Sequence, residues 1–437
     1  MATRKSVPNC RLYAAAAVSL ALVTAACAAP AASTAPAAST APTSSASASA
    51  AAASTAPSSS SSAAAATCNQ TEQTPGVTAT TITLGNTLPL TGSAATSGQG
   101  ALAGMKAYFD YVNAHGGVQG RQINFTSLDD EYKPAVAQQQ ARLLVQQNNI
   151  FAWVGGYGTP TFLAVEPFLM GENVPAIAPS AESDTLGTMS TPNMYATFVN
   201  YTTQYEIETK YIIGQYHPKS YALIGVAGNT GDAALKGMQL AVGSGVTIKY
   251  IPETPGNPNL TPIATTLKEA NADWVFIILT AADTGQLLGA MQRIGYTPHL
   301  AGNQIMADNS FIQPFKDVAN EMVVSTLTAD LNSSAPAVQQ FVRDFQAATG
   351  QAPTTNNALG WAQAEVGVQA LKTAPALTRS CLYSALNQMT DFQTGLIPPV
   401  TFGPTNRQGV DAIGMEQIVN GKLVPLLPTF VSLKDLE

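Results

Sequence analysis

Charged residues and histidine are scarce in this 437-residue sequence, and the common catalytic motifs are absent. Asp, Glu, Lys and Arg make up 11% of the residues, and the three histidines are His115, His217 and His299. None of them lies beside a Ser or Cys nucleophile motif, and GxSxG, HExxH and P-loop patterns are missing. The net charge is −7 at pH 7, without a basic patch. We therefore expect no enzyme, no cofactor and no nucleic-acid partner.

The acidic triplet Asp129-Asp130-Glu131 suggests a metal site at first sight. Sequence neighbours on one turn rarely converge on a single ion, however, and no regular ligand spacing follows the triplet. We therefore predict no metal site. We interpret these acids as side chains that interact with the dipole of the following helix, which Pro134 opens.

Long hydrophobic runs are also lacking. The apolar run at residues 12–26 is too short for a transmembrane helix, which needs about 20 apolar residues. Because Arg4, Lys5 and Arg11 precede it, residues 1–26 are predicted to be a secretory signal peptide. The residues VTAAC, ending at Cys27, resemble the lipobox of bacterial lipoproteins, which implies cleavage before Cys27 and a lipid on its thiol. Plain secretion is the alternative. We expect an exported chain, either lipid-anchored to the outer face of the cytoplasmic membrane or periplasmic or extracellular.

Residues 28–67 contain only Ala, Ser, Thr and Pro, with no charged side chain. Such a composition does not form a packed core, so residues 27–76 are predicted to be a disordered tether. The sequence has four cysteines. With Cys10 in the signal and Cys27 lipidated, Cys68 and Cys381 are left to form a disulfide in an exported protein. Two separate thiols are the alternative.

From about residue 77 onward, short apolar segments alternate with helical patterns. The alternation occurs in two blocks, residues 81–179 and 221–327, and is typical of α/β architecture with parallel sheets. Three segments suited to crossing between the blocks are residues 197–201, 326–331 and 398–401. The sequence therefore predicts two α/β lobes with three connections.

The segment 151–183, FAWVGGYGTPTFLAVEPFLMGENVPAIAPSAES, reads as strand, glycine turn, helix, strand and polar turn. Thr159 is predicted to cap the helix, with Pro160 at its first position. Two adjacent parallel strands would bring both polar turns to one edge of the sheet, where open α/β sheets bind ligands. Free N–H groups at the helix start favour an anion there. An ordinary βαβ unit, in which Ser and Thr only cap helices, is the alternative.

Several segments resemble the type I periplasmic binding proteins of the leucine/isoleucine/valine class. They are the run from TITLGNTLPLTG to DDEYKP, FAWVGGYGTPT, VPAIAPSAES, DWVFIILTAADTGQLLGAMQRIG and VTFGPTNRQG. The resemblance covers nearly all of residues 77–437. It implies two Rossmann-like lobes joined by a three-strand hinge, with lobe 1 at residues 77–198 and 329–398 and lobe 2 at 199–328 and 399–437. It also implies solute capture by lobe closure and delivery to an ABC permease.

The resemblance also implies which residues of lobe 1 contact the ligand. Thr159 matches the hydroxyl residue that binds the substrate carboxylate, and Ser180 and Ala181 match positions whose backbone contacts the ligand. Glu182 lies where the amino-acid binders usually carry Thr, and Ser97 lies where some members place an aromatic residue. From the sequence itself, Tyr157 in the glycine turn could stack on a planar ligand or merely shield the cleft.

In lobe 2 the sequence departs from the family pattern. Thr230 and Thr280 fall where tyrosines often cover the ligand, and Gln304 lies where the amino-acid binders place an acid near the ammonium group. A buried ammonium needs an anionic or carbonyl partner. Either another acid supplies the missing charge, or the ligand is an amide, a small carboxylate or an aromatic acid. The candidates for that acid are Glu182, Asp232, Asp283 and Asp308.

We therefore expect a monomeric solute-binding lipoprotein for a small polar ligand. The ligand would be a branched-chain or other amino acid, or a related amide or carboxylate. The partners would be a small molecule, ABC permease subunits and the membrane that holds the lipid. A ligand-binding sensor or surface-interaction module without transport would have nearly the same sequence, because a fold does not fix a function.

Overall fold

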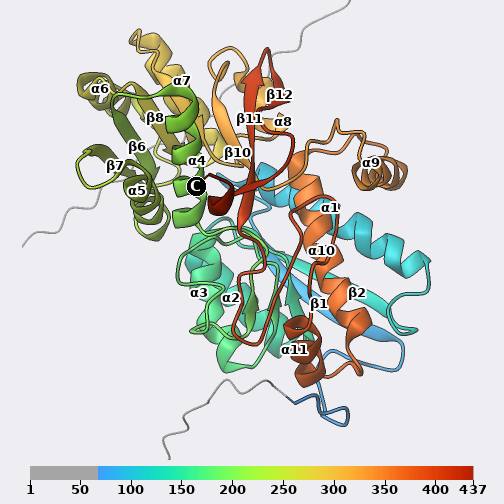
Figure 1. The fold of residues 1–437 in the computed structure, drawn as a ribbon. Helices are drawn as coiled ribbons and strands as arrows, with labels where there is room; N and C mark the ends of the chain where they lie inside the picture. Colours follow the sequence, from blue (N-terminus) through green and yellow to red (C-terminus); the bar gives the residue numbers. More distant parts are fainter. Residues whose placement is uncertain (1–66, 437) are drawn as a thin grey trace, which may run out of the picture. The chain divides into compact units, whose positions relative to one another are not determined.

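The structure is a computed structural model that describes residues 67–436 (Figure 1). The predicted signal peptide, Cys27 and residues 28–66 of the predicted tether lie outside these residues. Within the described residues, no helix combines the length and the apolar character that crossing a membrane requires. Cys68 and Cys381 form a disulfide, as predicted.

The first sheet is parallel and has the strand order β2-β1-β3-β4-β5. Alternate residues of β3 enter different cores, because side chains of a strand point to opposite faces. Val154 joins the core that includes α1 and α10, and Trp153 joins the core of α2 and α3. Helices therefore cover both faces. The strands are β1 (Thr81–Leu88), β2 (Gln122–Asp129), β3 (Ala152–Val154), β4 (Ala176–Ile177) and β5 (Met194–Tyr195), and the helices are α1 (Ala95–Ala114), α2 (Pro134–Gln146), α3 (Thr159–Gly171) and α10 (Thr355–Thr373).

The second sheet has the order β12-β11-β10-β9-β8-β6-β7, with β13 also paired to β11. Strands β6 to β10 are parallel to one another, and β11 runs antiparallel to β10. Its strands are β6 (Tyr221–Val226), β7 (Ile248–Glu253), β8 (Trp274–Ile278), β9 (His299–Gly302), β10 (Val323–Thr326), β11 (Ala412–Val419), β12 (Lys422–Pro425) and β13 (Val431–Ser432). The helices α4 (Tyr201–Tyr216) and α5 (Asn229–Val242) share a core with one face, and α6 (Thr261–Ala270) and α7 (Ala281–Arg293) with the other.

The chain passes between the two sheets three times: after β5, after β10 and before β11. Helices α9 (Pro336–Thr349), α10 and α11 (Arg379–Asn387) come between the second and third passages. Gly409 donates from its backbone N–H to Ala196 at 2.7 Å, and Ala329 donates likewise to Leu396 at 2.8 Å. The first passage therefore lies beside the third, and the second lies beside the loop that follows α11.

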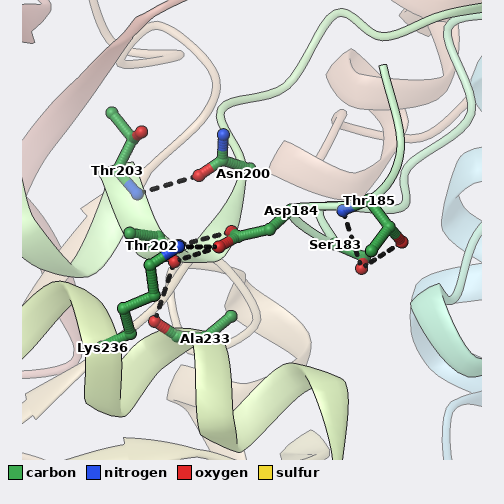
Figure 2. A network of polar contacts seen from close by, with 8 residues as sticks. All are labelled: Ser183, Asp184, Thr185, Asn200, Thr202, Thr203, Ala233 and Lys236. Atoms are coloured by element: carbon green, nitrogen blue, oxygen red, sulfur yellow. Dashed lines mark hydrogen bonds and ion pairs between the residues drawn. The ribbon is translucent and has the colours of Figure 1, made fainter. Parts of the chain in front are cut away.

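A polar network fastens the first passage to the second sheet (Figure 2). Asp184, in the loop between β4 and β5, accepts hydrogen bonds from Thr202 Oγ1 at 2.6 Å and Lys236 Nζ at 2.8 Å. Thr202 lies on α4 and Lys236 on α5. Asn200 caps α4 by accepting from the Thr203 N–H at 2.9 Å. One carboxylate thus ties the polar turn of residues 180–184 to two helices of the second sheet.

Two local predictions were wrong, and one helix was not predicted. Thr159 does not cap α3, because Gly158 is the N-cap residue and the Thr159 hydroxyl bonds to Glu182 instead. The acids before α2 do not lie in its first turn. Asp129 accepts instead from the backbone N–H groups of Leu90 and Thr91, which fixes the loop after β1. The sequence analysis also missed α8 (Asn309–Phe315), whose N-cap is Asp308.

Candidate functional site

The two polar turns of the segment 151–183 lie side by side at the carboxyl ends of β3 and β4. Tyr157 and Ser180 form a parallel bridge, and the Gly158 N–H donates to the Ser180 carbonyl at 2.9 Å. Gly158 has φ 118°, and a Cβ there would lie 2.9 Å from the ring of Tyr132. This position therefore requires glycine, and the close approach sets the start of α3 against the polar turn after β4.

Three predicted site residues and Tyr201 form a closed cluster of hydroxyl groups around one carboxylate. Ser180 Oγ donates to Glu182 Oε1 at 3.0 Å, and Thr159 Oγ1 donates to Glu182 Oε2 at 3.3 Å. The Glu182 N–H donates back to Thr159 Oγ1 at 3.1 Å, and the Tyr201 hydroxyl lies 3.1 Å from the same atom. We call Thr159, Ser180 and Tyr201 the hydroxyl cradle. Both carboxylate oxygens of Glu182 are thus held by groups of the chain itself.

Glu182 is deeply buried, with 3% of its surface exposed. Burial raises the pKa of its carboxyl group, and hydrogen bonds from Tyr201, Ser180 and Thr159 act in the opposite direction. The pKa of Tyr201 is also raised well above its ordinary value. Burial is the main cause, and the nearby Glu182 is the second. The cradle therefore contains hydrogen-bond donors for one carboxylate, and the side chain of Glu182 is that carboxylate.

A cavity of about 190 Å³ lies between elements of the two sheets. The cluster residues do not line it, but Tyr157, which does, is paired with Ser180 of the cluster. Three predicted site residues line it: Ser97 in α1, Tyr157 in the glycine turn and Thr280 before α7. The other lining residues include Tyr132, Ile305 and Phe315, which the sequence analysis had not selected. The pKa of Tyr132 is raised by burial first and then by the charges of Tyr157 and Glu182, among others, so its phenol lies near both.

The side chain of Gln304 belongs to a buried polar chain that reaches α4 and β10. Gln204 Nε2 donates to Gln304 Oε1 at 2.7 Å and to Ser325 Oγ at 3.0 Å, and Ser325 donates to Glu208 Oε2 at 3.2 Å. Burial raises the pKa of Glu208 well above its ordinary value. Gln304 also lines a small space of about 20 Å³ together with Tyr157 and Asn356. The Oε1 atom of Gln304 is therefore already used by Gln204.

The three lobe-2 acids considered as charge partners have other contacts. Asp232 is exposed and accepts from Tyr250. Asp283 accepts from Thr280 Oγ1 at 2.8 Å and from the Gly256 N–H at 3.0 Å. Asp308 accepts from Thr355 Oγ1 and from the Asn356 N–H, both in the first turn of α10. Thr230 lies in the first turn of α5 and is not among the residues that line either cavity described above.

A buried amide that sequence reasoning missed joins the two polar turns from behind. Gln363 on α10 donates from Nε2 to the Gly156 carbonyl at 3.1 Å and to the Ala178 carbonyl at 2.8 Å. A glutamine inside the otherwise small and apolar stretch of this helix was the available indication. The sequence indication for Tyr201 was its position directly after Asn200, the residue that caps α4.

A larger cavity of about 560 Å³ contains none of the predicted site residues. Asp330 and Glu416 line it, with Val342, Pro353 and Leu423 among the others. We place the candidate site at the smaller cavity, because that one adjoins the carboxyl ends of the parallel strands.

None of the three histidines takes part in these clusters. His115 bonds to the Tyr111 carbonyl, His217 ends α4, and His299 stacks on Trp274. The groups at the site are hydroxyls, amides and carboxyls arranged around small cavities, which is an arrangement suited to binding a small polar molecule.

Comparison with known proteins agrees with this geometry. Residues 81–422 match the family model described as periplasmic binding protein. The chain belongs to the periplasmic binding protein family. A Leu/Ile/Val-binding protein homologue from Brucella melitensis is 24% identical over 232 residues, which are 53% of this chain and 63% of that one. The Leu/Ile/Val-binding protein BraC3 from Rhizobium johnstonii is 22% identical over 348 residues, 78% of this chain and 93% of that one.

Solved structures of this family share the fold. A fatty acid ABC transporter substrate-binding protein from Thermomonospora curvata aligns with a TM-score of 0.74 at 21% identity, covering 84% of this chain and 96% of that one. The substrate-binding protein LivJ from Streptococcus pneumoniae, solved with isoleucine, aligns with a TM-score of 0.72 at 21% identity, covering 80% and 99%. These relatives are substrate-binding proteins, and their family is extracytoplasmic. The type I fold expected from the sequence is therefore confirmed.

Proposed function

We propose that this chain is an extracytoplasmic solute-binding protein that captures a small polar molecule and delivers it to an ABC permease. The observation that carries the proposal is the cavity of about 190 Å³, which residues of both α/β parts line and which Tyr157 connects to the hydroxyl cradle. The relatives named above are binding proteins for branched-chain amino acids or a fatty acid, so the family alone leaves the solute open.

Capture by closure requires two rigid lobes and a hinge that changes φ and ψ. The proposed lobes are residues 77–198 with 329–398, and residues 199–328 with 399–437. The bonds of Arg407 and Gly409 to Ala196 favour placing the last boundary near residue 410 rather than 399.

Native mass spectrometry of the purified full chain, followed by a denaturing run, tests solute capture. The proposal predicts a released small molecule at one copy per chain, or a rise in melting temperature with one member of a panel of amino acids, amides and organic acids. Ligand at 100 times its Kd stabilises a protein by about 2.7 kcal/mol, which a thermal scan detects. A chain that releases nothing and responds to no member of the panel contradicts the proposal.

Delivery and anchoring have separate tests. Solute-loaded chain should stimulate ATP hydrolysis by its ABC permease in proteoliposomes, whereas a sensor or surface module would bind solute without this effect.

A lipid on Cys27 predicts an intact mass increased by the acyl groups, and Cys27→Ser should abolish the increase. An unmodified Cys27 would favour plain secretion.

A further inference from the structure

The group that the hydroxyl cradle binds in this structure is the carboxylate of Glu182. Thr159 and Ser180 each donate to a different oxygen of the same carboxylate, at 3.3 Å and 3.0 Å, and that carboxylate belongs to Glu182. Hydroxyl donors converging on two oxygens form a carboxylate site. All members of this cluster are almost fully buried. A carboxylate of the chain therefore occupies this carboxylate site, which the pairing of Tyr157 with Ser180 connects to the cavity.

We propose that Glu182 determines the specificity of this cleft: it fills the hydroxyl cradle, so the solute is a neutral or cationic molecule that brings no carboxylate there. This inference rests on the proposed function of solute capture and narrows its ligand class. It separates this chain from binders of free amino acids or organic acids that would use the same hydroxyls.

Electrostatics around the cradle supports this assignment. Four carboxyl groups act on Tyr132 and Tyr157, the phenols that line the cavity on the side of the cradle: Glu182, Asp130, Asp283 and Asp308. An ionised Glu182 would repel a solute carboxylate placed about 4 Å away, because both groups carry negative charge. At an effective dielectric constant of about 20, that repulsion corresponds to a loss in affinity of about 100- to 1,000-fold.

Hydrogen bonding leads to the same conclusion. The Thr159 hydroxyl donates to Glu182, and its oxygen accepts the Glu182 N–H, with the Tyr201 hydroxyl also in reach. A second carboxylate would find these donors used. A solute amide, alcohol or ammonium group has donors of its own, which the acids and phenols around the cavity can accept.

The test uses pairs of probes that share a carbon skeleton and differ in the carboxylate: isovalerate with isovaleramide, and leucine with leucinamide. Binding is measured by calorimetry on the full chain and on two variants. Glu182→Thr removes the internal carboxylate and frees the cradle, while Glu182→Gln removes the charge and keeps the cradle filled. Melting temperature and the intact Cys68–Cys381 bond verify that each variant is folded.

We expect wild type to bind the amide of a pair more tightly than the carboxylate. Glu182→Gln should gain about 100-fold in affinity for isovalerate or leucine, because it removes the like charge, and Glu182→Thr should gain more, because it also frees the cradle. A wild-type chain that prefers the carboxylates, or a folded Glu182→Thr that gains no affinity for them, overturns the inference. So does a co-purified solute whose carboxylate is needed for binding.

The outcomes also separate this inference from the proposed function. A wild type that binds an amide or releases a solute supports solute capture, whatever Glu182→Thr does. If capture holds and the variant gains nothing, only the role of Glu182 fails. If neither protein binds any probe and no solute is released, both fail.

Discussion

Asp308 caps two helices with one carboxylate, and its removal is expected to weaken the packing between them. Oδ1 accepts from the Ser310 N–H in the first turn of α8 at 2.9 Å. Oδ2 accepts from the Asn356 N–H at 2.9 Å and from Thr355 Oγ1 at 2.7 Å, both in the first turn of α10. Helix α10 packs on the first sheet, whereas α8 follows β9 of the second. The side chain is 1% exposed.

The cost of Asp308→Ala follows from the donors left behind. The Asn356 N–H becomes a buried donor without an acceptor, which costs about 1–3 kcal/mol. Loss of the α8 cap adds about 1 kcal/mol. Thr355 Oγ1 keeps the Ala307 carbonyl at 2.8 Å and adds little. We expect a total loss of about 3 kcal/mol in the free energy of unfolding. Asp308→Asn should lose about 1 kcal/mol, because its single amide oxygen can still accept from the Asn356 N–H, whereas the Ser310 N–H loses its cap.

Urea unfolding of the full chain, followed by tryptophan fluorescence and circular dichroism, measures these losses. Asp435→Ala is the matched control, because Asp435 likewise accepts from a Ser N–H and hydroxyl but is exposed. Its loss should be small. The reasoning is refuted if Asp308→Ala is no less stable than Asp435→Ala. It is also refuted if Asp308→Asn costs as much as Asp308→Ala.

Three further changes test other parts of the fold. Arg379 donates to three backbone carbonyls at 2.9–3.0 Å, so Arg379→Met should cost about 3 kcal/mol in urea unfolding; a loss below about 1 kcal/mol would contradict this. Replacing Cys68 and Cys381 by Ser opens a link between residues 313 positions apart and should cost about 4 kcal/mol. Calorimetry of the double variant measures this cost, and an unchanged melting temperature would refute it. The pKa of Glu416 is raised to about 7, mainly by burial and secondly by the nearby charge of Asp330. Because the folded state keeps this proton longer than the unfolded chain, the contribution of Glu416 to stability should fall by about 3 kcal/mol between about pH 4.5 and 7. Glu416→Gln should remove that fall, and an unchanged pH profile would count against the assigned cause.

Sequence reasoning could predict features that depend on neighbours along the chain. The alternation of short apolar strands and helices fixed the α/β class, because the two periodicities of 2 and 3.6 residues are local. The glycine turn after β3 and the polar turn after β4 were likewise visible, and parallel pairing alone brings them to one edge. The pairing of Cys68 with Cys381 followed from the small number of cysteines and the expected export.

Roles that depend on which groups meet in space were decided only by the tertiary structure. The Thr159 hydroxyl can cap its own helix or serve a distant acceptor, and the buried carboxylate of Glu182 decides in favour of the second. Gln304 and Asp308 were considered as ligand partners, yet Gln204 and the start of α10 occupy their acceptor atoms. A buried polar group takes the partner that packing brings within about 3 Å, and a linear sequence does not contain that distance.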